Sequence, residues 1–123
     1  MPQPSPTRAG NAAEDHALEF LQGHGLELLT RNWRCKGGEL DLVMLDTDTV
    51  VFVEVRYRSH AGFGGALGSI DERKQKRLTL AASLFLQSEP RWATRPCRFD
   101  VVALQGQGHA GQPLQWLKNA FEC

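Results

Sequence analysis

Four charged side chains lie within two apolar runs, at positions where a pair of strands would ordinarily carry hydrophobic residues. The segment GGELDLVMLDTDTVVFVEVRYR, residues 37–58, contains both runs and a polar turn between them. Glu39 and Asp41 belong to the first run, and Glu54 and Arg56 belong to the second. Carboxylates that converge across two strands are the ligands that hard divalent cations prefer. The chemistry therefore depends on which residues face each other.

The turn between the two runs sets this register. If residues 46–49 form a four-residue loop, or residues 47 and 48 a two-residue turn, the numbers of facing residues sum to 95. Asp41 is then opposite Glu54, and Glu39 is opposite Arg56. We expect the Asp41 and Glu54 Cβ atoms to be about 5 Å apart. Two negative charges about 4 Å apart repel by about 1 kcal/mol in water and by about 4 kcal/mol at an effective dielectric constant of about 20.

Solvent, Arg56, a shared proton or a divalent cation could offset this repulsion. A cation such as Mg²⁺ is typically held by one or two carboxylates together with water and a substrate phosphate. Asp41 and Glu54 have the chemistry for that role. The alternative is a solvated hairpin end at which Arg56 neutralises the neighbouring acids. The two residue types and their spacing leave both interpretations open.

Composition favours one globular domain. The chain has 123 residues, of which 41% are hydrophobic, and its 14 basic and 14 acidic residues cancel. We expect residues 1–10 to be a disordered lead-in and residues 11–123 to form a single domain. The apolar runs are too short to cross a membrane. Three widely spaced cysteines predict reduced thiols and a cytoplasmic protein.

Hydrophobic periodicity predicts three helices and four strands in the order α-β-β-β-α-β-α. Asn11 and Glu14 are typical of a helix start, and Ser69 and Glu72 predict a second one. The expected strands cover residues 26–34, 38–45, 50–57 and 97–104, and the expected later helices cover residues 71–87 and 113–121. This order favours an α/β fold in which helices pack on a mixed central sheet.

Basic residues are concentrated in the middle of the chain. Arg58 directly follows the second apolar run. Four more cations lie at the start of the helix expected at residues 71–87: Arg73, Lys74, Lys76 and Arg77. A helix start favours phosphate through its free amides, so these residues are candidates for nucleic-acid binding. An ordinary solvated helix face is the alternative. The zero net charge argues against tight sequence-independent binding at physiological salt.

Asp41, a 12-residue gap and then Glu54-Val55-Arg56 resemble the D…(D/E)-x-K signature of restriction-endonuclease-like nucleases. The resemblance extends over residues 10–121. The ordered series GNAAEDHALEFLQGHGLELLTRNWR, GELDLV, VFVEVRYR, FG, RKQKRL, RFDVV and KNAF is similar to the YraN-type family of bacterial proteins. That family is related to archaeal Holliday-junction resolvases.

This resemblance implies a restriction-endonuclease-like, or PD-(D/E)xK, core with a Mg²⁺ or Mn²⁺ site. Asp41 and Glu54 match the two metal-binding acids, and the Val55 carbonyl matches a further ligand. Glu14 matches an acid that this class carries on its first helix. Glu39 belongs to the family's GE-x-D form, where it either contributes to the metal site or forms a salt bridge with Arg56 or Arg58.

Arg56 departs from the signature, which usually has lysine at this position. Arginine stays protonated and cannot act as a base, although it can bind a phosphate in a bidentate manner. Hydrolysis would then depend on metal-activated water, and Lys74 or Lys76 could replace the missing lysine.

The function that the resemblance implies is a metal-dependent endonuclease. Its expected substrates are branched or flapped DNA, including junctions of single and double strands. The related resolvases act as dimers, which makes a homodimer a further expectation. The alternative is a DNA-binding or DNA-processing adaptor module that has the same fold and does not cut DNA.

Overall fold

A computed structural model describes residues 8–58, 70–105 and 114–121 of the chain. These ranges contain two α-helices, one short 3-10 helix and five strands. In chain order they are α1 (Arg8–Gly23), β1 (Glu27–Cys35), β2 (Gly38–Asp46), β3 (Thr49–Arg58), α3 (Glu72–Ser88), η1 (Pro90–Trp92), β4 (Cys97–Gln105) and β5 (Leu114–Phe121).

The five strands form one mixed sheet in the order β1-β2-β3-β4-β5. Neighbouring strands are antiparallel except β3 and β4, which are parallel. A parallel pair needs a crossover connection, and α3 lies in the segment between β3 and β4. The α/β class and the mixed sheet expected from the sequence are confirmed.

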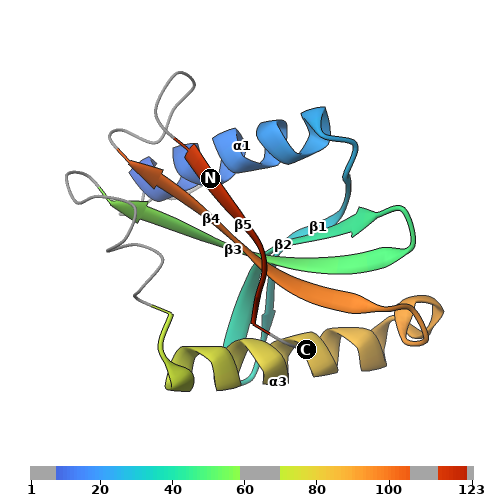
Figure 1. The fold of residues 1–123 in the computed structure, drawn as a ribbon. Coiled ribbons are helices and arrows are strands. Elements are labelled where there is room, and N and C mark those ends of the chain that lie inside the picture. The colour runs from blue at the N-terminus through green and yellow to red at the C-terminus, as the bar shows by residue number, and fades with distance from the viewer. Residues whose placement is uncertain (1–7, 59–69, 106–113, 122–123) are drawn as a thin grey trace, which may run out of the picture.

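One helix covers each face of the sheet (Figure 1). Ala13, Ala17 and Leu21 of α1 are buried in a cluster with Leu42, Met44, Val51 and Val53 of the sheet. On the opposite face α3 contributes an apolar stripe at helical spacing: Leu78, Ala81, Ala82 and Phe85. These four residues pack against Val43, Val50, Phe52 and Phe99. The central strands are therefore covered on both faces, which explains their nearly continuous runs of valine.

The ends of both helices differ from the expectations. α1 begins at Arg8, three residues before Asn11, so residues 8–10 are helical. α3 is capped by Asp71, whose side chain accepts a hydrogen bond from the Lys74 amide. Ser69, the expected cap, lies outside the described residues. An aspartate at the N-cap bonds a first-turn amide as serine does.

The last element is a strand and not the expected helix. Leu114, Leu117 and Phe121 have helical spacing, but β5 pairs antiparallel with β4 from Leu114 to Phe121. The unpaired edge of β4 outweighs the weak helical pattern of eight residues.

One cysteine also differs from the expectation of reduced thiols. Cys35 is free, whereas Cys97 takes part in a disulfide bond.

Candidate active site at the fork between β2 and β3

The predicted register of β2 and β3 is confirmed, and the ladder ends where the acids begin. Facing residues from Asp46 and Thr49 to Leu42 and Val53 pair as expected. Asp41 and Glu54, the next pair, are not part of the ladder. The Val55 N–H instead donates a hydrogen bond of 2.9 Å to Oδ2 of Asp41. A carboxylate thus replaces a backbone acceptor at the point where β2 leaves β3.

β2 also changes face at this point. Leu42 packs on the α1 side of the sheet, but Leu40 packs on the α3 side, although regular alternation along a strand would place both on one face. In the neighbouring strand Asn32 has a positive φ of 54°. Asn32 lies between the β1 residues that pair with Leu40 and Leu42, so the irregularity is opposite Asp41. Both strands are therefore distorted around this carboxylate.

The surroundings of Asp41 favour its protonated form. Burial is the main cause and the nearby Glu54 charge is the second, and together they raise the pKa of Asp41 from 3.8 to about 8. The Val55 N–H lowers this pKa, while Glu14 and a side-chain hydrogen bond with Glu54 raise it further. Of the offsets that the sequence left open, a shared proton therefore fits Asp41 at neutral pH.

Glu54 is buried, with 6% of its surface exposed, and is neutralised by two cations. Arg56 Nη1 is 3.2 Å from Glu54 Oε2. Lys74 Nζ, which comes from the first turn of α3, is 3.3 Å from the same oxygen. Lys76 is exposed and makes no ion pair with any other described residue. Lys74, and not Lys76, is thus the helix lysine that reaches the site.

Glu14 lies close enough to Asp41 to raise its pKa, and α1 places it there. Arg31 Nη2 is 3.3 Å from Glu14 Oε1 and 3.0 Å from Asp15 Oδ1. Burial raises the pKa of Glu14, although Arg31 and Asn32 oppose this shift through hydrogen bonds. Glu14 therefore contributes negative potential to the site while it is bonded to β1.

Glu39 is not opposite Arg56 as the register predicted, because the β2–β3 ladder has already ended. Its Oε2 atom is 3.5 Å from Arg34 Nε, across the β1–β2 pair. The side chains of Arg34 and Glu39 are 79% and 41% exposed, so solvent weakens this ion pair. The expected ion pair with Arg58 involves a side chain outside the described residues.

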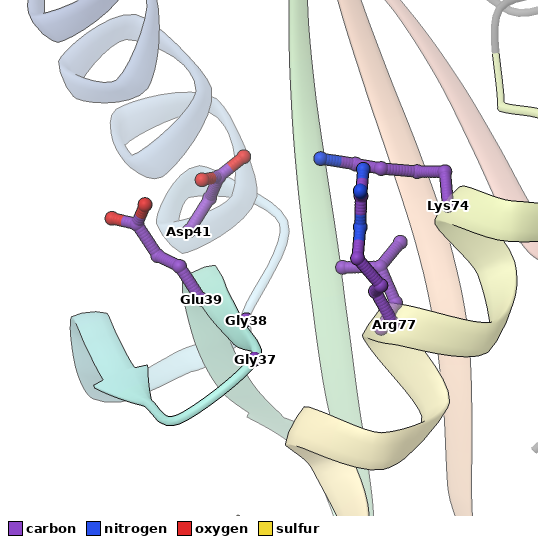
Figure 2. A pocket seen from close by; sticks show the side chains of 7 residues that line it. Gly37, Gly38, Glu39, Asp41, Lys74 and Arg77 are labelled. Carbon is purple, nitrogen blue, oxygen red and sulfur yellow. The ribbon is translucent and has the colours of Figure 1, made fainter.

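A pocket of about 400 Å³ lies beside the acids (Figure 2). Asp41 and Glu39 project from β2, and Lys74 and Arg77 project from α3 toward the same space. The remaining lining residues are Gly37, Gly38 and Leu78. Sequence reasoning missed these three, although two adjacent glycines before Glu39 were a signal for a close approach of the chain.

The first two turns of α3 carry four of the cations expected to contact nucleic acid. Arg73, Lys76 and Arg77 are exposed, and Lys74 is half-buried. The Lys74 amide is already bonded to Asp71, so that amide is not free for a phosphate as the helix-start argument assumed. Any phosphate contact there would involve the side chains.

The donor set fits a hydrated divalent cation better than a cage of protein ligands. Within residues 8–58, 70–105 and 114–121, no group of three or more His, Cys, Asp and Glu side chains is placed to hold a metal. Asp41 and Glu54 nevertheless supply two adjacent carboxylates. Mg²⁺ commonly binds one or two carboxylates and completes its shell with water and phosphate. The roles expected for the Val55 carbonyl and for Glu39 remain predictions.

A second buried acid serves the sheet. Asp100 is fully buried and accepts hydrogen bonds from Arg98, from Trp116 Nε1 at 2.9 Å and from the Asn119 amide at 2.9 Å. Arg98 also bonds Asp46 at 3.0 Å. These bonds join β4 to β5 and to the end of β2, so we assign Asp100 to the stability of the fold.

The fold and this site define a small α/β protein with paired carboxylates at a fork in its mixed sheet. The model of uncharacterised protein family UPF0102 matches residues 13–104. The chain belongs to this family, which confirms the resemblance found in the sequence.

Several relatives are similar over their full lengths. A UPF0102 protein of Pseudomonas entomophila (strain L48) is 87% identical over 123 residues, which cover all of both chains. One of Pseudomonas putida (strain W619) is 84% identical, again over all of both chains. A third, of Pseudomonas fluorescens, is 64% identical over 122 residues, or 99% of each chain. Among the described residues, no helix is long and apolar enough to span a membrane.

Proposed function

We propose that the protein is a Mg²⁺- or Mn²⁺-dependent endonuclease with a restriction-endonuclease-like core. The observation that carries this proposal is the convergence of the Asp41 and Glu54 carboxylates at the β2–β3 fork, beside a pocket that cations of α3 line. Two acids that lie side by side and largely shielded from water destabilise a fold, so their presence indicates a functional purpose. Binding a cation next to a phosphate is such a purpose.

Each residue has a part that follows from its surroundings. Asp41 and Glu54 would hold the cation, and Asp41 would give up its proton on binding, since only the ionised carboxylate is a good ligand. The cation would act as a Lewis acid that acidifies water and screens the charge of the phosphate. Arg56 is only 3.2 Å from Glu54 and would stabilise negative charge on the phosphate without acting as a base. Glu14 would strengthen the negative potential that attracts the cation.

DNA is the proposed substrate, and five cations of β3 and α3 are its proposed contacts. Arg58, Arg73, Lys74, Lys76 and Arg77 form this set. Because the net charge is zero, we expect affinity to come from shape and from this local basic surface more than from bulk charge. Branched or flapped DNA is proposed because the family that the sequence resembles is related to junction resolvases, and a homodimer is proposed on the same ground.

A module that binds DNA without cutting it is the second candidate. The specific observation in its favour is that two cations, Arg56 and Lys74, already contact one Glu54 oxygen, at 3.2 and 3.3 Å. A metal would have to compete with this neutralised carboxylate, and the strand lysine of the signature is absent.

A cleavage assay on four-way junctions, flaps, splayed arms and linear duplexes separates the two functions. We expect the wild-type protein to cut at least one branched substrate in Mn²⁺ or Mg²⁺, and Asp41→Asn and Glu54→Gln to be inactive while still binding it. Asp48→Asn is the matched control, because Asp48 is an exposed turn residue. Binding of branched DNA by the wild type without cleavage under any metal would establish the second candidate.

A further inference from the structure

The cations of α3 fall into two groups according to what they face. Lys74 and Arg77 line the pocket beside Asp41, together with Leu78 (Figure 2). Residues three and four apart share one side of a helix, so these three lie on a single face. Arg73 and Lys76 do not line the pocket and are exposed. The charged start of α3 thus presents two surfaces with different surroundings.

The two pocket cations also differ from each other. The Lys74 side chain is 29% exposed and contacts Glu54, which already has Arg56 as a second cation. Loss of Lys74 from this contact would therefore leave Glu54 paired. The guanidinium of Arg77 makes no ion pair or hydrogen bond with any other described residue. Lys74 can therefore leave Glu54 without leaving that carboxylate unpaired, and the guanidinium of Arg77 can bind a ligand without breaking a contact of this kind.

The backbone of the β1–β2 turn brings the opposite wall close to these cations. Gly37 has a φ of +95°, which residues with a side chain rarely adopt. A Cβ atom at Gly38 would lie 3.3 Å from the Arg77 carbonyl oxygen, so glycine permits the turn to approach α3. Glu39, on the acidic wall, has its charge partly compensated by Arg34. The volume of about 400 Å³ is more than enough for a phosphate group and the atoms attached to it.

We infer that this pocket binds one phosphate group of a nucleic-acid strand, with Lys74 and Arg77 as its cationic ligands. Lys74 moves from Glu54 to the phosphate when the strand binds, and Arg56 remains on Glu54. Arg73 and Lys76 contact other phosphates of the backbone from the outer side of α3. The inference rests on the proposed function in one respect: the bound phosphate is the one beside the Asp41–Glu54 pair, where cleavage would occur.

Inorganic phosphate is the first probe, and it is added without metal. Its binding is measured by NMR as shifts of the Gly37 and Gly38 amide signals. We expect phosphate to shift both amides in the wild type. Lys74→Met and Arg77→Met should each weaken this binding about tenfold, the effect of losing one charge-assisted hydrogen bond. Lys76→Met is the matched control and should change the affinity for inorganic phosphate less than about twofold. Arg77→Met removes no hydrogen bond or ion pair with a described residue, so it keeps the test valid if Lys74→Met unfolds.

A short single-stranded oligonucleotide then identifies the source of the phosphate. It should displace inorganic phosphate from the wild type. Its affinity for Lys76→Met should depend less on salt than its affinity for the wild type, by about one released counterion. If the oligonucleotide leaves phosphate in place, the pocket serves a free anion and the inference is wrong. Equal losses for Lys74→Met and Lys76→Met would also overturn it, because the two surfaces would then not differ.

The outcome for the pocket is separable from the outcome for the enzyme. Phosphate binding that depends on Lys74 and Arg77, without cleavage of any DNA, supports the pocket and contradicts the nuclease. Cleavage by the wild type at a rate that Lys74→Met and Arg77→Met leave unchanged, with no phosphate shift at Gly37 or Gly38, supports the nuclease and contradicts the pocket.

Discussion

The raised pKa of Asp41 predicts a dependence of stability on pH that Asp41→Asn should remove. The folded protein holds a proton on Asp41 up to about pH 8, whereas the unfolded chain loses it near 3.8. The folded state therefore binds the extra proton between these values. Its free energy of unfolding falls as the pH rises through this window and levels off above about pH 8.

The size of this change in the free energy of unfolding follows from one bound proton and from the width of the pH window. One proton corresponds to about 1.4 kcal/mol per pH unit, so Asp41 can lower the free energy of unfolding by up to about 4 kcal/mol between about pH 5 and about pH 8. Asparagine is neutral at every pH and can still accept the hydrogen bond from the Val55 N–H. We therefore expect the free energy of unfolding of Asp41→Asn, relative to that of the wild type, to increase as the pH rises.

Urea unfolding, followed by tryptophan fluorescence at several pH values, measures this difference directly. Asp48→Asn is the control and should differ from the wild type by the same small amount at each pH. Glu54→Gln should lower the pKa of Asp41 and so narrow this pH window without closing it, because burial is a larger cause of the shift than the Glu54 charge. A difference between Asp41→Asn and the wild type that does not change from about pH 5 to about pH 8 would refute the proposed electrostatics of the fork.

Three further variants test separate parts of the structure. Arg56→Lys should raise or leave unchanged any rate of DNA cleavage, measured under single-turnover conditions, because it restores the residue usual in the signature. Trp116→Phe leaves a buried acceptor on Asp100 without its indole donor and should lower the free energy of unfolding in urea by about 1–3 kcal/mol. Asp71→Ala removes the cap on the Lys74 amide and should cost about 1 kcal/mol in the same assay.

Each of these expectations has a contradicting result. A collapse of the cleavage rate in Arg56→Lys would mean that the guanidinium itself is required. Wild-type stability in Trp116→Phe would mean that Asp100 finds another donor. An unchanged stability of Asp71→Ala would mean that the first turn of α3 is held by packing alone.

Local sequence was sufficient to predict the elements that depend on neighbours in the chain. The valine-rich runs and the polar turn predicted the β2–β3 register, and hydrophobic periodicity predicted α3 to within one residue of its observed ends. The end of the ladder was not predictable in this way. It depends on the hydrogen bond between Asp41 and the Val55 N–H and on the positive φ of Asn32, which belongs to another strand.

Contacts between distant segments account for the remaining differences. Lys74 reaches Glu54 because the segment between two parallel strands places α3 beside β3, and lysine spacing within the helix carries no information about this. β5 is a strand because β4 offers it an edge, although Leu114 and Leu117 have helical spacing. Gly38 lines the pocket, and a Cβ atom there would lie 3.3 Å from the Arg77 carbonyl oxygen of α3. Because α3 is distant in the sequence, local sequence did not predict this close approach.

Calorimetric titration with Mn²⁺ tests most directly whether the fork at Asp41 and Glu54 is a metal site. At about pH 7 we expect the wild type to bind one ion and to release a proton, so that the measured heat changes with the ionisation enthalpy of the buffer. Asp48→Asn should behave in the same way, and Asp41→Asn should show neither the binding heat nor the proton release. Equal heats in the wild type and Asp41→Asn, or no binding heat in either, would contradict a metal site at this fork.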